Sequence, residues 1–118
     1  MSVLVISLVL ATACINDECF NVLVGKNNLT PVGEYSTYYA KTNQFGYDGE
    51  VIVFKETNTV AFSIHKPFKS LNNPYYREKV IQSNNPQDRK ISNGCINIPS
   101  DMFDKYKHSI EKVIILDK

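Results

Sequence analysis

One stretch of the sequence carries the residue types of a thiol nucleophile. Cys95 directly follows Gly94 in the run Ile91-Ser92-Asn93-Gly94-Cys95. Because glycine has no Cβ, the backbone before Cys95 can turn tightly and bring its N–H groups near a bound carbonyl. Cys95 could then attack that carbonyl as a thiolate. Taken alone, the triplet Asn93-Gly94-Cys95 is more typical of a small, buried cysteine that serves only packing than of a nucleophile.

A histidine on a predicted strand offers a base for such a thiol. Residues 59–64 are mostly β-branched and apolar, and strand alternation places Ile64 on one face and Ser63 and His65 on the other. We expect the larger side chains to fill the core and the small neighbours to leave open space beside the imidazole. A single histidine on a strand is more often structural than catalytic, so both roles stay open on this pattern.

Three motifs occur in an order that resembles the L,D-transpeptidase catalytic domain, the YkuD-type cysteine enzymes that cross-link bacterial peptidoglycan. The family pattern is Thr-Pro-x-Gly, then a histidine at a strand end, then Ser/Thr-His-Gly-Cys followed by an aliphatic residue and Asn or Arg. The corresponding residues are Thr30, Pro31, Gly33, His65, Ser92, Gly94, Cys95, Ile96 and Asn97. The resemblance spans most of the chain. It departs at Asn93, where most of the family has a second histidine, and in the long interval between His65 and Cys95.

The resemblance implies a role for each matching residue. Cys95 would be the nucleophile and His65 the general base, with its ring oriented by the main-chain carbonyl of Lys66. The N–H groups of Gly94 and Cys95 would stabilise the oxyanion. The residues expected to shape the pocket by hydrogen bonding are Ser92, Asn93 and Asn97. The implied substrate is a peptidoglycan stem peptide that loses its terminal D-alanine, after which an amine or water attacks the acyl-enzyme.

The segment 66–90 is long and polar, and a loop of this length in a compact domain is commonly a lid or a substrate-binding element. Residues 75–81 predict a short helical turn inside it. The basic residues that could bind the carboxylates of a stem peptide are Arg77, Arg89 and Lys90. Solvated surface charge is the ordinary role of each of them.

Composition narrows the class of protein. The 118 residues fit one domain, 1–118, and 13 basic against 12 acidic residues give no sign of nucleic acid or an anionic membrane as the main partner. Seven tyrosines and six phenylalanines suit a β-rich chain. With the resemblance, this predicts a β-rich α+β fold, a mixed sheet or sandwich with one or two short helices. No metal or cofactor is expected, because His65 and His108 share no ligand spacing and a glycine-rich phosphate loop is missing.

Residues Ser2–Ile15 allow two interpretations. The apolar run followed by small residues resembles a signal peptide cleaved after Ala13, although no Lys or Arg precedes Lys26 to form a positive n-region. The stretch is too short to span a bilayer. Its β-branched content and the turn at residues 16–17 favour a first strand, and the resemblance favours it too.

Cys14 and Cys19 flank the loop 15–18 and would face each other across a hairpin, within disulfide range. A disulfide and a pair of reduced thiols are both open interpretations. A disulfide would fit an oxidising compartment, and the resemblance implies the cell envelope, the periplasm or secretion.

The remaining elements follow from local patterns. Further strands are predicted at residues 20–25, 34–40, 50–54, 59–64 and 113–116. Ser100 is the expected N-cap of a helix. The apolar side of that helix would consist of Met102, Phe103, Tyr106 and Ile110. His108 falls away from that side and is expected to face solvent.

Two alternatives to an active enzyme stay open. Asn93 and the long interval before Cys95 would suit a catalytically weak or inactive peptidoglycan-binding module of the same fold. The small size of the chain would suit an interbacterial or phage-borne cell-wall effector.

Overall fold

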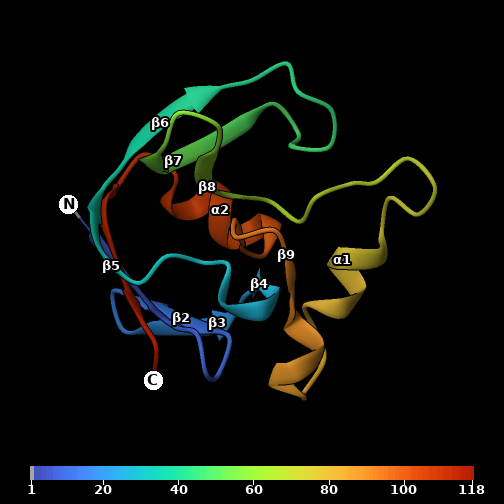
Figure 1. Cartoon of the computed structure of the whole chain (residues 1–118), viewed down its shortest axis with the longest axis horizontal. Helices are drawn as coiled ribbons and strands as arrows, with labels where there is room; N and C mark the ends of the chain where they lie inside the picture. The colour runs from blue at the N-terminus through green and yellow to red at the C-terminus, as the bar shows by residue number, and fades with distance from the viewer. Residues whose placement is uncertain (1) are drawn as a thin grey trace.

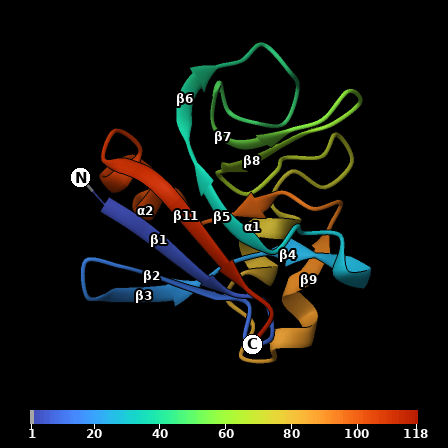
Figure 2. The ribbon, with the colours of Figure 1, turned by 60° about the vertical axis from the view of Figure 1, so that its left-hand side comes forward.

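The computed structural model describes residues 2–118. Its elements in chain order are β1 (Ser2–Ser7), β2 (Thr12–Ile15), β3 (Glu18–Asn21), β4 (Val24–Gly25), η1 (Lys26–Asn28), β5 (Gly33–Ser36), β6 (Tyr38–Lys41), β7 (Glu50–Glu56), β8 (Ala61–His65), α1 (Tyr76–Val80), η2 (Pro86–Arg89), β9 (Lys90–Ser92), β10 (Ile96–Asn97), α2 (Ser100–Tyr106) and β11 (Ile110–Leu116). The predicted β-rich α+β fold is confirmed (Figure 1). In Figure 2 the sheet that contains β7 and β8 lies above the sheet that contains β1 and β11.

The larger sheet has the strand order β3-β2-β1-β11-β5. β1 runs parallel to β11, and the other neighbours are antiparallel. Alternate residues of β1 explain its central place, because Leu4 and Ile6 are fully buried while Val3 and Val5 face outward. The closing strand expected at 113–116 is confirmed as the end of β11.

A single strand over residues 2–15 is wrong. The chain reverses between β1 and β2, where the Leu10 N–H donates to Ser7 Oγ at 3.1 Å and Ala11 has a positive φ of 48°. The expected hairpin that follows is confirmed, since Cys14 pairs with Cys19 in the β2–β3 register. The two cysteines form a disulfide with their Cα atoms 4.1 Å apart.

The smaller sheet has the order β10-β8-β7-β6 and contains the predicted hairpin. β7 and β8 extend or trim the predicted strands 50–54 and 59–64 by one or two residues. A single strand over 34–40 is wrong, because β5 pairs with β11 in the larger sheet while β6 pairs with β7 in the smaller one. Thr37 fixes the bend between them, since its N–H donates to the Glu111 carbonyl and its Oγ1 to the Ile110 carbonyl, both in β11 and each at 3.0 Å.

The strand predicted at residues 20–25 also divides, and this division positions the cysteine loop. β3 stays in the larger sheet, whereas β4 leaves it and pairs in parallel with β9, which leads directly to Cys95. Leu23, between β3 and β4, bridges to Asn97 in β10. The segment 22–25 therefore links the larger sheet to both strands that flank the Gly94–Cys95 turn.

α2 packs its predicted apolar side into the core. Phe103 is fully buried, Tyr106 is buried, and Met102 packs against the same cluster. Ile110 as a residue of this helix is wrong, because α2 ends at Tyr106 and the buried Ile110 is the first residue of β11. Ser100 as the N-cap is wrong, because Ser100 is already helical and the capping position is Pro99, which has no side-chain donor or acceptor. His108 is exposed as predicted.

None of the helices in residues 2–118 is both long enough and apolar enough to cross a membrane.

Candidate active site

The pairing of β8 with β10 brings the predicted nucleophile and base together. The two strands run parallel, with Asn97 opposite His65, so the turn before β10 places Cys95 beside Ser63 of β8. Cys95 and His65 line the same cleft of about 150 Å³. The other residues of its lining are Tyr47, Phe68, Arg77, Ser92 and Asn93.

Gly94 is required by the shape of the turn. Its φ is +123°, and a Cβ at this position would lie 2.5 Å from the Phe62 ring and 2.9 Å from the Leu29 carbonyl oxygen. Only a residue without a side chain fits this conformation and this space. The predicted tight turn before Cys95 is therefore present in the structure.

Thr30, from the Thr-Pro-x-Gly motif, holds this turn from behind. Its buried Oγ1 donates to the Gly94 carbonyl at 3.0 Å and accepts from the Gly25 N–H at 2.8 Å. Because the C=O and N–H of a trans peptide point in opposite directions, the bond to Gly94 directs the Cys95 N–H away from Thr30. Thr30 is thus a positioning residue. From the sequence it could be matched to the Thr-Pro-x-Gly motif, but no role was predicted for its side chain.

One of the two expected oxyanion donors already has a partner. The Gly94 N–H donates to Ser92 Oγ at 3.0 Å, and the same hydroxyl donates to the Cys95 carbonyl at 2.6 Å. Ser92 therefore braces the turn rather than offering its hydroxyl to the cleft. Of the two N–H groups, the Cys95 N–H is the one without a backbone or side-chain acceptor among residues 2–118.

His65 lies in the orientation that the resemblance implies. Its Nδ1 is 2.6 Å from the Lys66 carbonyl oxygen, which requires a proton on Nδ1 and leaves the lone pair on Nε2. Burial lowers the pKa of His65 to about 4, and the positive charge of Arg77 acts in the same direction. The ring is therefore neutral at pH 7 and has the protonation state of a base.

The expected open space beside the imidazole is filled. His65 is 1% exposed, and the Tyr47 ring packs edge-on against it with centroids 4.7 Å apart. On the same face of β8, the Cys95 thiol occupies the space beside the small side chain of Ser63. Cys95 Sγ lies 3.5 Å from the Ser63 N–H nitrogen and 3.8 Å from Ser63 Oγ.

Ser63 and Ala61 are the hydrogen-bond partners of the Cys95 thiol within the described residues, since Sγ also lies 3.9 Å from the Ala61 carbonyl oxygen. Sequence reasoning placed Ser63 on the face of His65 but assigned it no contact with the thiol. The alternation that puts both side chains on one face is a signal that could have identified it.

Asn97 positions two residues that line the cleft, Phe68 and Arg77. The Oδ1 of the fully buried Asn97 accepts from the Phe68 N–H at 2.9 Å and from Arg77 Nη1 at 3.2 Å. The guanidinium carbon lies 5.4 Å from the centroid of the Phe68 ring. Asn97 does not line the cleft; it fixes the two residues that do. The expected helical turn that carries Arg77 is confirmed as α1.

Arg89 lies elsewhere. It is 3% exposed, and its guanidinium donates to the carbonyls of Leu10 at 2.7 Å, Ala11 at 3.2 Å and Ser83. These bonds join the end of the segment 66–90 to the turn between β1 and β2. The structure does not bring Arg89 to the cleft. Asn93, by contrast, is exposed at the rim of the cleft.

Tyr47 and Phe68 were missed as residues of the cleft. Their rings stack edge-to-face with centroids 5.2 Å apart, and Phe68 packs so closely on Gly46 that a Cβ there would lie 2.2 Å from the ring. An aromatic residue between Gly46 and Gly49 in a polar loop is the one signal the sequence held for Tyr47.

In residues 2–118 there is no group of three or more His, Cys, Asp or Glu side chains that could hold a metal ion.

No protein-family model and no curated protein sequence matches this chain. Solved structures do match. L,D-transpeptidase 3 from Mycobacterium tuberculosis, in complex with a faropenem-derived adduct, is 14% identical with a TM-score of 0.68 over 98% of this chain and 60% of that one. An L,D-transpeptidase from Mycobacterium smegmatis is 15% identical with a TM-score of 0.60 over 98% and 58%. An L,D-transpeptidase (Yku) from Stackebrandtia nassauensis is 13% identical with a TM-score of 0.60 over 99% and 56%.

The chain therefore has the L,D-transpeptidase catalytic fold. It spans 56% to 60% of the length of these three solved chains.

Proposed function

We propose that this chain is a cysteine acyl transferase of the L,D-transpeptidase type that acts on peptidoglycan stem peptides in the cell envelope. The observation that carries the proposal is the parallel pairing of β8 and β10, which places Cys95 and a neutral His65 in one cleft. The disulfide between Cys14 and Cys19 is consistent with an oxidising compartment.

The reaction would begin with transfer of the thiol proton to Nε2 of His65. The Sγ of Cys95 contacts Ser63 and Ala61, so the thiol must first rotate toward the ring. A base with a pKa near 4 is weak, and the nearby thiolate must stabilise the imidazolium that forms. Cys95 then attacks the stem-peptide carbonyl, and a C–S bond forms.

The negative charge of the tetrahedral intermediate would be stabilised by the Cys95 N–H, whose direction Thr30 fixes through the Gly94 carbonyl. The C–N bond to the terminal D-alanine breaks, and the leaving amine takes the proton from His65. Attack of an amine on the thioester forms a cross-link between stem peptides. Attack of water releases the shortened stem peptide, in which case the protein acts as a carboxypeptidase. The guanidinium of Arg77 is the cation of the cleft that would bind a substrate carboxylate.

Covalent labelling tests the nucleophile. Because one of the solved neighbours carries a faropenem-derived adduct, we expect incubation with faropenem to add the mass of the acyl group to this chain. Cys95 is the free cysteine of the described chain, so Cys95→Ala should abolish the adduct. An adduct of equal yield on Cys95→Ala would contradict the role of Cys95.

Turnover is tested with tetrapeptide muropeptides, with and without an added amino-acid acceptor, followed by mass spectrometry. We expect loss or exchange of D-alanine with the unmodified chain and neither with Cys95→Ala. If faropenem labels the protein but the muropeptide is unchanged, the proposed nucleophile is right and the proposed substrate is wrong. If neither reaction occurs, the proposed nucleophile is wrong.

A binding module without turnover is the second candidate. It is favoured by the bond between the Gly94 N–H and Ser92 and by the position of the thiol against Ser63 rather than His65. This candidate predicts that muropeptides bind, as measured by calorimetry, with no adduct from faropenem. Asn93→His would then be the first variant to test for gained activity.

A further inference from the structure

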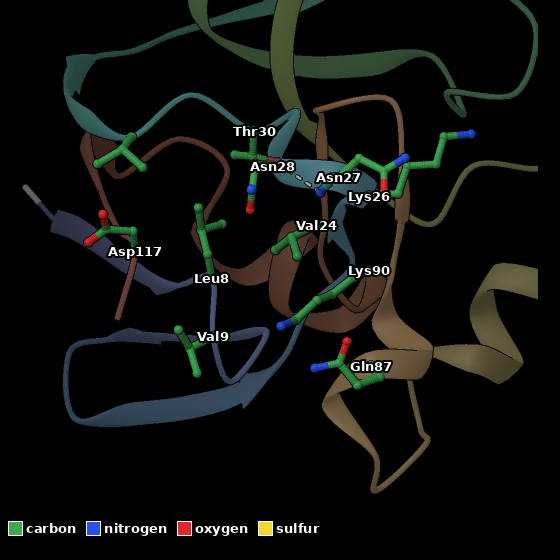
Figure 3. Close-up of a pocket in the computed structure, with 12 residues that line it drawn as sticks. Leu8, Val9, Val24, Lys26, Asn27, Asn28, Thr30, Gln87, Lys90 and Asp117 are labelled. Carbon is green, nitrogen blue, oxygen red and sulfur yellow. Dashed lines mark hydrogen bonds between the residues drawn. The ribbon is translucent and has the colours of Figure 1, made fainter.

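A second cavity, of about 570 Å³, lies behind the turn that carries Cys95. It forms where the turn between β1 and β2, the segment 24–32 and the start of β9 come together (Figure 3). Its volume lies within the range of roughly 300–1,000 Å³ that is typical of small-molecule sites. The lining residues used below are Leu8, Val9, Val24, Asn28, Gln87 and Lys90.

The cavity presents one positive charge to its interior. Figure 3 shows the ammonium group of Lys90 pointing into the cavity near the Gln87 amide, whereas the ammonium of Lys26 points away from it. No carboxylate within residues 2–118 lies within ion-pair distance of Lys90. Asp117, the acidic residue of the lining, lies on the far side of the cavity from Lys90 in Figure 3.

The rest of the interior combines aliphatic surface with an amide. Leu8 and Val24 lie between Lys90 and the Asn28 side chain, whose amide also points into the cavity (Figure 3). A ligand that matched these groups would need one negative charge, a short aliphatic part and a polar group for the amides. A single ammonium beside neutral amides suits a singly charged carboxylate better than a doubly charged phosphate.

We propose that this cavity binds a carboxylate carried on a short aliphatic group, as in the C-terminus of a peptide or a free amino acid. The carboxylate contacts Lys90 and Gln87, and the aliphatic part lies on Leu8 and Val24. The proposal does not depend on catalysis by Cys95, because the cavity and the cleft share no lining residue.

Binding can be measured by ¹H–¹⁵N NMR titration of the full chain carrying Cys95→Ala, which removes any reaction in the cleft. The probes are N-acetyl-D-alanine, its neutral counterpart N-acetyl-D-alaninamide, and free D-alanine. We expect N-acetyl-D-alanine to shift the amide signals of Val24, Gly25 and Asn28, with little effect from the uncharged amide. D-alanine shifting the same signals would identify free amino acids as a second source of the carboxylate.

Three lysine variants complete the test. Lys90→Met keeps the aliphatic stem and should weaken binding of N-acetyl-D-alanine roughly tenfold or more, since a charge-assisted hydrogen bond is lost. The ammonium of Lys26 points away from the cavity, so Lys26→Met should bind N-acetyl-D-alanine as before. Lys90→Arg keeps the positive charge and should retain most of the affinity, and it replaces Lys90→Met in the comparison if Lys90→Met fails to fold. Shifts confined to Tyr47, His65 and Arg77, equal shifts with the uncharged amide, or unchanged binding in Lys90→Met would each overturn the proposal.

Discussion

The Cys95 cleft and the cavity beside Lys90 differ in size and in how firmly their polar groups are held in place. The Cys95 cleft is about 150 Å³, whereas the cavity beside Lys90 is about 570 Å³. In the small cleft, each reactive group is held by a named contact, such as the bond of His65 to the Lys66 carbonyl. In the larger cavity, the amides and the ammonium of Lys90 come from exposed or half-buried residues. Volume alone would have pointed away from the cleft that we propose for catalysis.

Thr30 connects the two regions. Its side chain lines the larger cavity, and its Oγ1 holds the Gly94 carbonyl of the cysteine turn. The wall of the cavity is thus the support of the cleft. A substitution in the Cys95 cleft should leave carboxylate binding beside Lys90 unchanged, and a substitution in the Lys90 cavity should leave Cys95 acylation unchanged. A substitution of Thr30 should affect both.

Removing the base should produce the largest effect. We expect His65→Gln to lower the rate of Cys95 acylation by faropenem roughly 10²- to 10⁴-fold, because the thiol loses its proton acceptor. Carboxylate binding beside Lys90 should be unchanged. His108→Gln is the matched control, since His108 is exposed and stacks on Tyr39 away from the cleft. An equal loss in both variants would remove His65 from the mechanism.

Thr30→Val should affect both regions. It leaves the buried Gly25 N–H and the Gly94 carbonyl without a partner, which costs about 1–3 kcal/mol of stability. Acylation should slow by roughly 10- to 100-fold, because the Cys95 N–H is no longer held in place. Thr30→Ser retains the hydroxyl and should restore the rate. Urea unfolding and stopped-flow labelling separate the two effects, and a stable but fully active Thr30→Val would contradict the positioning role.

Acidification should destabilise the chain through His65. The pKa of His65 falls from 6.5 to about 4 on folding, so the unfolded chain binds more protons between these values. The contribution of the neutral His65 to the free energy of unfolding is fully present above pH 6.5 and is lost as the pH falls toward 4. We expect a loss of about 2 kcal/mol between pH 7 and pH 5 in urea titrations. The difference between the unmodified chain and His65→Gln isolates this contribution, and identical pH dependence would refute it.

Ser63→Ala should give the smallest effect. The Ser63 hydroxyl lies 3.8 Å from Cys95 Sγ and would stabilise a thiolate. We expect alkylation of Cys95 by iodoacetamide at pH 7 to slow roughly threefold. Lys90→Met offers the comparison from the other region, and an equal slowing there would mean that the regions are coupled.

Much of the fold could be predicted because local pattern decides it. The alternation of β7 and β8, the apolar side of α2 and the hairpin between Cys14 and Cys19 each depend on side chains a few residues apart. The predicted strands 2–15, 20–25 and 34–40 each divided instead. At these places the sequence stays β-branched or aromatic while the chain changes its pairing partner, and propensity does not encode the partner.

The candidate site shows the same division. The order of the Thr30, His65 and Cys95 motifs, and the Lys66 carbonyl as partner of the ring, were available from the sequence through the family resemblance. The burial of Arg89 was not, because two of its acceptor carbonyls, those of Leu10 and Ala11, lie at the opposite end of the chain.

By itself, the sequence determined the residue types, the left-handed turn that only Gly94 permits, and the face of β8 that carries His65 and Ser63. The tertiary structure alone decided that the Cys95 thiol fills the space beside Ser63, and that burial holds His65 neutral. The physical reason is that a pKa and a thiol's hydrogen bonds depend on every group packed around them. Those neighbours, Tyr47 and Arg77 among them, arrive through pairings that no local pattern specifies.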